Sequence, residues 1–136
     1  MNENVFLDTN IFVYLYSEDE PEKQSIAISI FDKVQCITST QVLNEFCSVC
    51  LRKLKIHSEE ILLSINEILE NCEICKIDIE TIKSAVLLNN KYGYTFYDCL
   101  VLSSAIQNSC YYLYSEDMQH NQIIEGKLKI VNPFVK

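Results

Sequence analysis

The sequence predicts a single α/β domain, with a mainly parallel central sheet of four to five strands and helices on both of its faces. Short apolar, strand-like runs alternate with longer helical patterns along the chain, and parallel strands need crossover connections that are usually helical. The length of 136 residues fits one compact domain, 1–136, and is short for two.

In the first half of the chain, turn and cap residues separate the expected elements. Pro21 is suited to open a helix, because the first helical residue needs no amide hydrogen. Ser39 or Thr40 can cap a second helix, and Glu59 and Glu60 fit the first turn of a third, where the helix dipole favours negative charge. We expect a strand at 4–7, helices at 10–16 and 22–34, a strand at 36–38, a helix from 39 or 40 to about 55, and a helix that starts at 58.

In the second half, Gly93 is the clearest break. An achiral residue can adopt the left-handed conformation that ends many helices. We expect a strand at 74–77, helices at 79–92 and 97–108, a strand at 111–114, and a last, edge strand at 129–131.

Composition narrows the class of protein. The hydrophobic fraction of 49% with 22% charged residues is typical of an ordered globular domain. No basic segment precedes the first apolar run, and no apolar stretch approaches the ~18 residues of a membrane span, so we expect a cytoplasmic protein with no membrane partner. The 7 cysteines, scattered in apolar surroundings, predict buried reduced thiols.

The formal net charge of −8 argues against a general polyanion-binding protein. It is compatible with an acidic site that a cation neutralises, beside a small basic cluster that could contact a phosphate backbone. That cluster consists of Arg52, Lys53 and Lys55. The structural alternative is a solvated helix end.

Four carboxylates stand where an acid is unusual. Asp8 and Asp117 each follow a strand-like run, Glu45 borders the apolar stripe of a helix, and Asp98 shares a helix face with apolar residues. Carboxyl ends of parallel strands meet at one edge of a sheet, so Asp8 and Asp117 are expected at the same rim. Each acid alone has a structural alternative as a helix cap, a stripe-edge residue or a turn residue. Together they predict a divalent-metal site for phosphodiester hydrolysis.

Four segments that contain these acids resemble the PIN-domain family of nucleases. They are residues 6–11, 42–46, 97–100 with Ala105 downstream, and 113–117, in an order that covers nearly the whole chain. The small single-domain format is most similar to the toxin half of bacterial VapBC-type, or type II, toxin–antitoxin pairs.

The resemblance implies an endoribonuclease that hydrolyses RNA phosphodiester bonds with Mg²⁺ or Mn²⁺. The implied metal ligands are Asp8, Glu45, Asp98 and Asp117, and the implied polar support is Thr9, Asn10 and Ser115. It also implies a homodimer and a small antitoxin protein as partner. Glu116 stands beside Asp117 and leaves open which of the two is the ligand, and Cys99 replaces a common alanine. One or two metal ions are compatible with this set.

Three other interpretations compete. A non-catalytic module that binds nucleic acid or protein could retain the same fold. A phosphatase with Asp8 as nucleophile is disfavoured because Asn10 replaces the second acid of such sites. Two C-x₂-C pairs, at 47–50 and 72–75, have the spacing of a four-cysteine zinc site. The first pair lies on an apolar helix stripe, which favours buried cysteines. His57 and His120 are expected at the surface.

Overall fold

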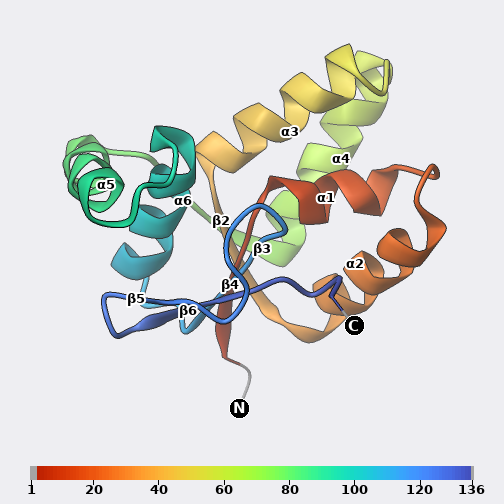
Figure 1. Ribbon diagram of the computed structural model, residues 1–136. Helices are drawn as coiled ribbons and strands as arrows, with labels where there is room; N and C mark the ends of the chain where they lie inside the picture. The colour runs from red at the N-terminus through yellow and green to blue at the C-terminus, as the bar shows by residue number, and fades with distance from the viewer. Residues whose placement is uncertain (1–2, 136) are drawn as a thin grey trace.

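A six-stranded sheet in the order β3-β2-β1-β4-β6-β5 forms the centre of the molecule (Figure 1). The computed structural model describes residues 3–135. The strands are β1 (Asn4–Leu7), β2 (Gln35–Ser39), β3 (Cys72–Cys75), β4 (Tyr112–Tyr114), β5 (Ile123–Ile124) and β6 (Leu128–Val131). All neighbours pair in parallel except β5 and β6, which are antiparallel.

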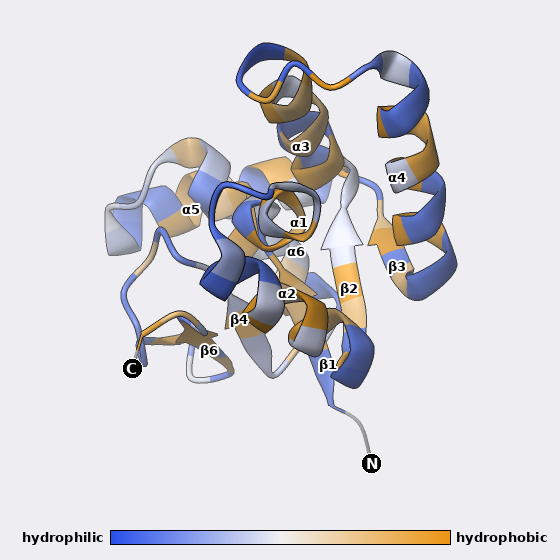
Figure 2. Ribbon diagram, turned by 90° about the vertical axis from the view of Figure 1, so that its right-hand side faces the viewer, coloured by the Kyte–Doolittle hydropathy of each residue, from blue (hydrophilic) through white to orange (hydrophobic). Residues whose placement is uncertain are grey.

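Helices cover both faces of this sheet. They are α1 (Thr9–Tyr16), α2 (Pro21–Lys33), α3 (Thr40–Arg52), α4 (Ser58–Asn71), α5 (Ile79–Tyr92) and α6 (Phe96–Gln107). Figure 1 shows α5 and α6 on one side, and α1, α2 and α4 on the other. In Figure 2, hydrophobic and hydrophilic residues alternate along α3 and α4, as expected for helices with one buried face. The predicted α/β domain with a mainly parallel sheet is confirmed.

The core lies between the sheet and these helices. Phe6 from β1, Phe12 from α1 and Phe46 from α3 are fully buried. The rings of Phe12 and Phe46 meet edge to face, with centroids 6.5 Å apart, an arrangement that adds to the free energy of burying the rings. This contact fixes α1 against α3 just beyond the carboxyl end of β1.

Most element boundaries agree with the predictions to within one or two residues, and the exceptions have local causes. The helix expected to reach about residue 55 ends at Arg52, where the chain turns through Lys55 in a left-handed conformation (φ 51°). The third strand starts at Cys72 rather than at 74, because it pairs in register with β2. Asp78 then caps α5, and its carboxylate accepts a hydrogen bond from the amide of Thr81.

The sheet has one strand more than expected. β5 contains only two residues and no long apolar run, so no sequence pattern predicted it. Glu125 (φ 53°) and Gly126 (φ 66°) form the turn that folds it back onto β6. The expected edge position of the last strand is therefore wrong, because β6 lies between β4 and β5.

The cysteines differ from the prediction at one pair. Cys36 on β2 and Cys72 on β3 are register partners with Cα atoms 4.7 Å apart, and a disulfide joins them. The expectation that all thiols are reduced is wrong there, and Cys72 is not free to join a four-cysteine zinc site. Cys50 is buried on the apolar face of α3, as a small filler residue would be. In residues 3–135, no helix combines the length and the apolar character that crossing a bilayer requires.

Candidate active site

Asp8 connects the end of β1 to the start of α1. The residue is 4% exposed, and its carboxylate accepts two hydrogen bonds, from the backbone amide of Thr9 at Oδ1 (2.7 Å) and from the Ser115 hydroxyl at Oδ2 (2.7 Å). Asp8 is therefore the N-cap of α1. It also lines the pocket described below, so a role as helix cap is compatible with a role as metal ligand.

Glu45 approaches from α3. Ser39 begins this helix, because its hydroxyl accepts a hydrogen bond from the amide of Val42 (3.2 Å). The half-buried Glu45 carboxylate accepts a hydrogen bond from the Thr9 hydroxyl at Oε2 (2.8 Å). Through this bond Thr9, the residue after Asp8, contacts a residue of α3 that lies 36 positions further along the chain.

Asp98 enters from the first turn of α6. The Thr95 hydroxyl caps this helix by accepting a hydrogen bond from the amide of Asp98 (3.2 Å). Residues 99–105, directly after it, are all buried. The Asp98 side chain is half-buried at the edge of this apolar segment, so the helix start holds it at the boundary between core and solvent.

Asp117 follows β4, the strand beside β1. Ser115 is fully buried, and its hydroxyl accepts a hydrogen bond from the amide of Asp117 (3.2 Å) while donating to Asp8. The Asn10 amide group lies 3.3 Å from the Asp117 carboxylate. The Glu116 side chain points elsewhere, toward Lys23 and Tyr14.

All four acids line one pocket of about 300 Å³ at the carboxyl edge of the sheet. Its lining residues are Asp8, Thr9, Asn10, Glu45, Ser48, Val49, Arg52, Asp98 and Asp117. The tertiary structure therefore brings acids from four separate parts of the chain to the lining of one pocket. Glu116 is not among them, so at the exit of β4 only Asp117 faces the pocket.

Ser48 and Val49 also line this pocket, and no functional prediction named them. A usable signal was present in the sequence: with Glu45 and Arg52 they stand at positions i, i+3, i+4 and i+7, which form one helix face. Of the predicted basic cluster, only Arg52 lines the pocket. His120 lies at the surface, where its Nδ1 accepts a hydrogen bond from the amide of Asn132 (2.9 Å).

The pocket concentrates negative charge that no basic side chain pairs. Burial raises the pKa of Asp8 to about 7, opposed by the hydrogen bonds from Ser115 and Thr9 and assisted by the charges of Asp117 and Asp98. Burial is also the main cause that raises the pKa of Asp98 and of Asp117. Between residues 3 and 135, no ion pair within 4.0 Å involves any of the four acids.

This donor set fits a hard divalent cation. Carboxylate oxygens are preferred ligands of Mg²⁺, which usually takes one or two of them directly and keeps several waters. Across the part of the chain that is described, no three Asp, Glu, His or Cys side chains converge on one metal position. The pocket therefore suits an ion held by few direct ligands, with the other acids acting through its waters.

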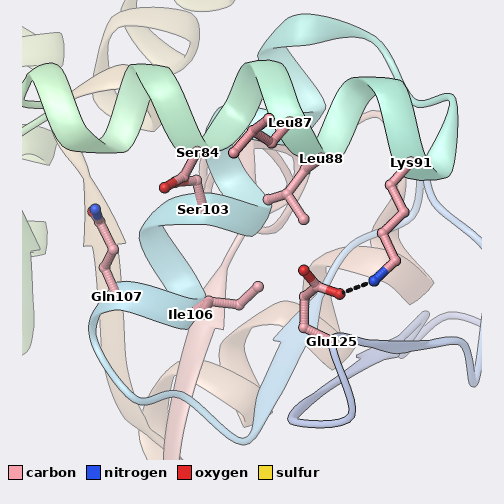
Figure 3. A pocket seen from close by; sticks show the side chains of 8 residues that line it. All are labelled: Ser84, Leu87, Leu88, Lys91, Ser103, Ile106, Gln107 and Glu125. Atoms are coloured by element: carbon pink, nitrogen blue, oxygen red, sulfur yellow. Dashed lines mark hydrogen bonds and ion pairs between the residues drawn. The ribbon is translucent and has the colours of Figure 1, made fainter.

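A second hollow, of about 200 Å³, lies between α5 and α6 (Figure 3). Its walls are largely apolar, from Leu87, Leu88 and Ile106. Lys91 and Glu125 face each other across one end, with Nζ and Oε2 2.5 Å apart. Its charges are paired, unlike those of the carboxylate pocket.

Comparisons with known proteins agree with this fold. The PIN domain model matches residues 5–125. No curated protein matches the chain.

Several solved structures share the fold at low sequence identity. A toxin–antitoxin complex from Klebsiella pneumoniae is 18% identical with a TM-score of 0.72, over 96% of this chain and 98% of that one. VapC20 of Mycobacterium tuberculosis, a toxin that cleaves the sarcin-ricin loop, is 15% identical with a TM-score of 0.68, over 83% and 89%. VapBC2 of Rickettsia felis bound to a promoter DNA fragment is 20% identical with a TM-score of 0.66, over 93% and 98%. With a family model that matches most of its length, the chain belongs to the PIN-domain family.

Proposed function

We propose that this protein is a divalent-metal-dependent endoribonuclease and the toxin of a type II toxin–antitoxin pair. The observation that carries the proposal is the pocket that is lined by four carboxylates from separate parts of the chain and holds no ion pair to them within 4.0 Å among the described residues. An unpaired group of this kind costs free energy on folding unless a cation or bound protons compensate it. Membership of the PIN-domain family supports a nuclease, and the similar structures support a toxin.

In this proposal Asp8, Glu45, Asp98 and Asp117 hold Mg²⁺ or Mn²⁺. When bound, the ion supplies the Lewis acidity and the activated water that phosphodiester hydrolysis needs. Neighbouring hydroxyl and amide groups hold the carboxylates of Asp8, Glu45 and Asp117 in place through the hydrogen bonds described above. These supporting residues are Thr9, Asn10 and Ser115.

Arg52 is proposed to contact the RNA phosphate. It lines the pocket from the last turn of α3 and forms no ion pair with the four acids. A guanidinium can bind a phosphate through two parallel hydrogen bonds. Lys53 and Lys55 follow Arg52 in the chain, are exposed, and add positive charge near it. This local charge lets a protein of net charge −8 approach a polyanion.

A small antitoxin, a homodimer and a cytoplasmic location complete the proposal. Structures with the same fold include toxin–antitoxin complexes, which supports a protein partner that covers the toxin. An antitoxin that covers the carboxylate pocket would protect the host RNA. Co-purification of this chain with the product of a neighbouring short reading frame would test that partner.

Cleavage of labelled structured RNA tests the activity. A sarcin-ricin-type stem-loop is a suitable first substrate, because VapC20 with the same fold cleaves that loop. We expect cleavage in Mg²⁺ or Mn²⁺, none in EDTA, and none with Asp98→Asn. Asp32→Asn is the matched control, because Asp32 is an exposed acid on α2 outside the pocket.

Equal behaviour of wild type and Asp98→Asn on several RNAs, with folding verified by circular dichroism, would contradict the enzyme. RNA or protein binding without cleavage would instead favour the non-catalytic module.

A further inference from the structure

Two adjacent acids leave β4 in different directions. Asp117 lines the carboxylate pocket, whereas Glu116 accepts a hydrogen bond from the Tyr14 hydroxyl at Oε1 (2.6 Å) and lies 2.5 Å from the Lys23 ammonium at Oε2. Both carboxylate oxygens of Glu116 are therefore engaged outside the pocket. The local sequence offers two equivalent acids, and contacts with α1 and α2 distinguish them.

Lys23 is held in place from several sides. Its Nζ lies 3.2 Å from the Tyr14 hydroxyl, 5.0 Å from the centroid of the Tyr14 ring and 5.6 Å from that of Phe134. A cation within about 6 Å of an aromatic centroid is attracted by the ring. Lys23 thus joins α2, α1, the exit of β4 and the C-terminal segment at one point.

The Lys23–Glu116 pair is also more sheltered than the pair on α5. Its side chains are 33% and 22% exposed, at a separation of 2.5 Å. Lys83 and Glu80, also paired, are 69% and 75% exposed and 3.7 Å apart. Exposed pairs contribute little because water and salt screen them. The Lys23 contact therefore has the geometry to determine where the Glu116 carboxylate lies.

We propose that Lys23 and Tyr14 hold Glu116 out of the carboxylate pocket, and that Lys23 is thereby a positioning residue that leaves Asp117 as the acid presented to the metal. This rests on the proposed metal-dependent function. Without Lys23, the Glu116 carboxylate keeps the Tyr14 hydroxyl as its partner at Oε1, and its Oε2 becomes available as an oxygen ligand one residue from Asp117. Ca²⁺ accommodates six to eight oxygen ligands, whereas Mg²⁺ demands a compact octahedral set with several waters. Lys23 therefore keeps the pocket selective for the smaller ion.

Two substitutions that break the same ion pair provide the test. Lys23→Met removes the charge, keeps a long apolar side chain, and leaves the Glu116 carboxylate without its cationic partner. Glu116→Gln also removes the ion pair but leaves no carboxylate. By calorimetric titration without RNA, we expect Lys23→Met to raise the ratio of Ca²⁺ to Mg²⁺ affinity about 3- to 10-fold. Glu116→Gln, and Lys23→Met combined with Glu116→Gln, should retain the wild-type ratio.

Further variants separate positioning from general loosening of the structure. Lys23→Arg keeps the charge and should keep the wild-type ratio. Lys83→Met removes the exposed pair on α5 and should also leave it unchanged. A merely structural role of the ion pair would change the ratio alike in Lys23→Met and Glu116→Gln, and that result would overturn the proposal.

The outcomes distinguish this inference from the proposed function. If the wild type binds Mg²⁺ and Asp98→Asn weakens that binding, while Lys23→Met leaves the Ca²⁺ to Mg²⁺ ratio unchanged, the inference fails and the metal site remains supported. If the folded wild type binds neither ion, both are overturned. Circular dichroism and thermal melts of each variant verify that it is folded.

Discussion

The carboxylate pocket and the hollow between α5 and α6 differ in how their polar groups are satisfied. Around the hollow between α5 and α6, Lys91 pairs with Glu125 (2.5 Å), Ser103 donates to the Thr81 carbonyl (2.9 Å), and the Thr81 hydroxyl donates to Gln107 (2.7 Å). The carboxylate pocket instead has four acids in its lining, and three of them, Asp8, Glu45 and Asp117, accept hydrogen bonds from neutral donors.

This difference bears on which of the two hollows would bind the proposed metal ion. Charges that are already paired within the protein need no bound ion to compensate them. Unpaired carboxylates that repel one another raise the free energy of the metal-free protein, and a divalent cation lowers it again. The hollow with the more apolar walls is therefore not the one proposed to bind metal and RNA.

The largest contrast is expected in catalysis. Glu45→Gln should lower the rate of RNA cleavage by about 100-fold or more, because it removes a proposed metal ligand while keeping the shape of the side chain. Glu125→Gln, in the second hollow, should change the rate by less than about twofold. Single-turnover cleavage assays with both variants measure this difference. Comparable losses in the two variants would contradict the distinction between the hollows.

The stability of the metal-free protein provides a second contrast. The pKa of Asp8 is raised from 3.8 to about 7, so the folded state binds a proton more tightly than the unfolded state. The contribution of Asp8 to the stability of the wild type in EDTA therefore falls as the pH rises from about 4 to 7. Asn does not titrate, so Asp8→Asn should be more stable than the wild type at pH 8 by about 1–3 kcal/mol.

At pH 5 that advantage should largely vanish, because Asp8 is then protonated in the folded wild type. Guanidinium denaturation at both pH values in EDTA measures it, with Asp32→Asn as the exposed control. An equal difference at pH 5 and pH 8 would show that the charge of Asp8 is not its cause.

A third effect concerns RNA affinity. Arg52→Ala should weaken RNA binding about 3- to 10-fold and reduce its salt dependence by about one phosphate contact, because it removes one charge that displaces counterions. Metal affinity should not fall, since Arg52 is not a proposed ligand. Fluorescence anisotropy at several salt concentrations, with the cleavage-impaired Asp98→Asn protein as background, measures this. Unchanged affinity and salt slope would place the RNA elsewhere.

The smallest effect is expected in the second hollow. Lys91→Met breaks the pair with Glu125, whose side chains are 60% and 37% exposed, so it should cost less than about 1 kcal/mol of stability. Mg²⁺ should protect this variant against thermal unfolding as much as it protects the wild type. Thermal melts with and without Mg²⁺ test both statements. A smaller increase of the melting temperature by Mg²⁺ in this variant would show that the two hollows are coupled.

Local sequence was sufficient to predict the fold class and the four acids. Apolar runs that alternate with capped helices predicted the parallel sheet. Each acid stands next to a strand end, a helix start or an apolar helix stripe, and these are features of neighbouring residues. The short β5 was not predicted, because two residues are too few to show a periodic pattern. The Cys36–Cys72 disulfide was not predicted either. The two thiols lie 36 positions apart in the chain, and only the register of β2 with β3 brings them together.

The sequence by itself determined all the elements except β5, and it singled out the four acids beside them. Only the tertiary structure decided which side chains share the pocket. It selected Asp117 over Glu116 and added Arg52, Ser48 and Val49. The physical reason is that the direction of a side chain at a strand exit depends on partners brought near by folding. Lys23, 93 positions before Glu116 in the chain, is such a partner.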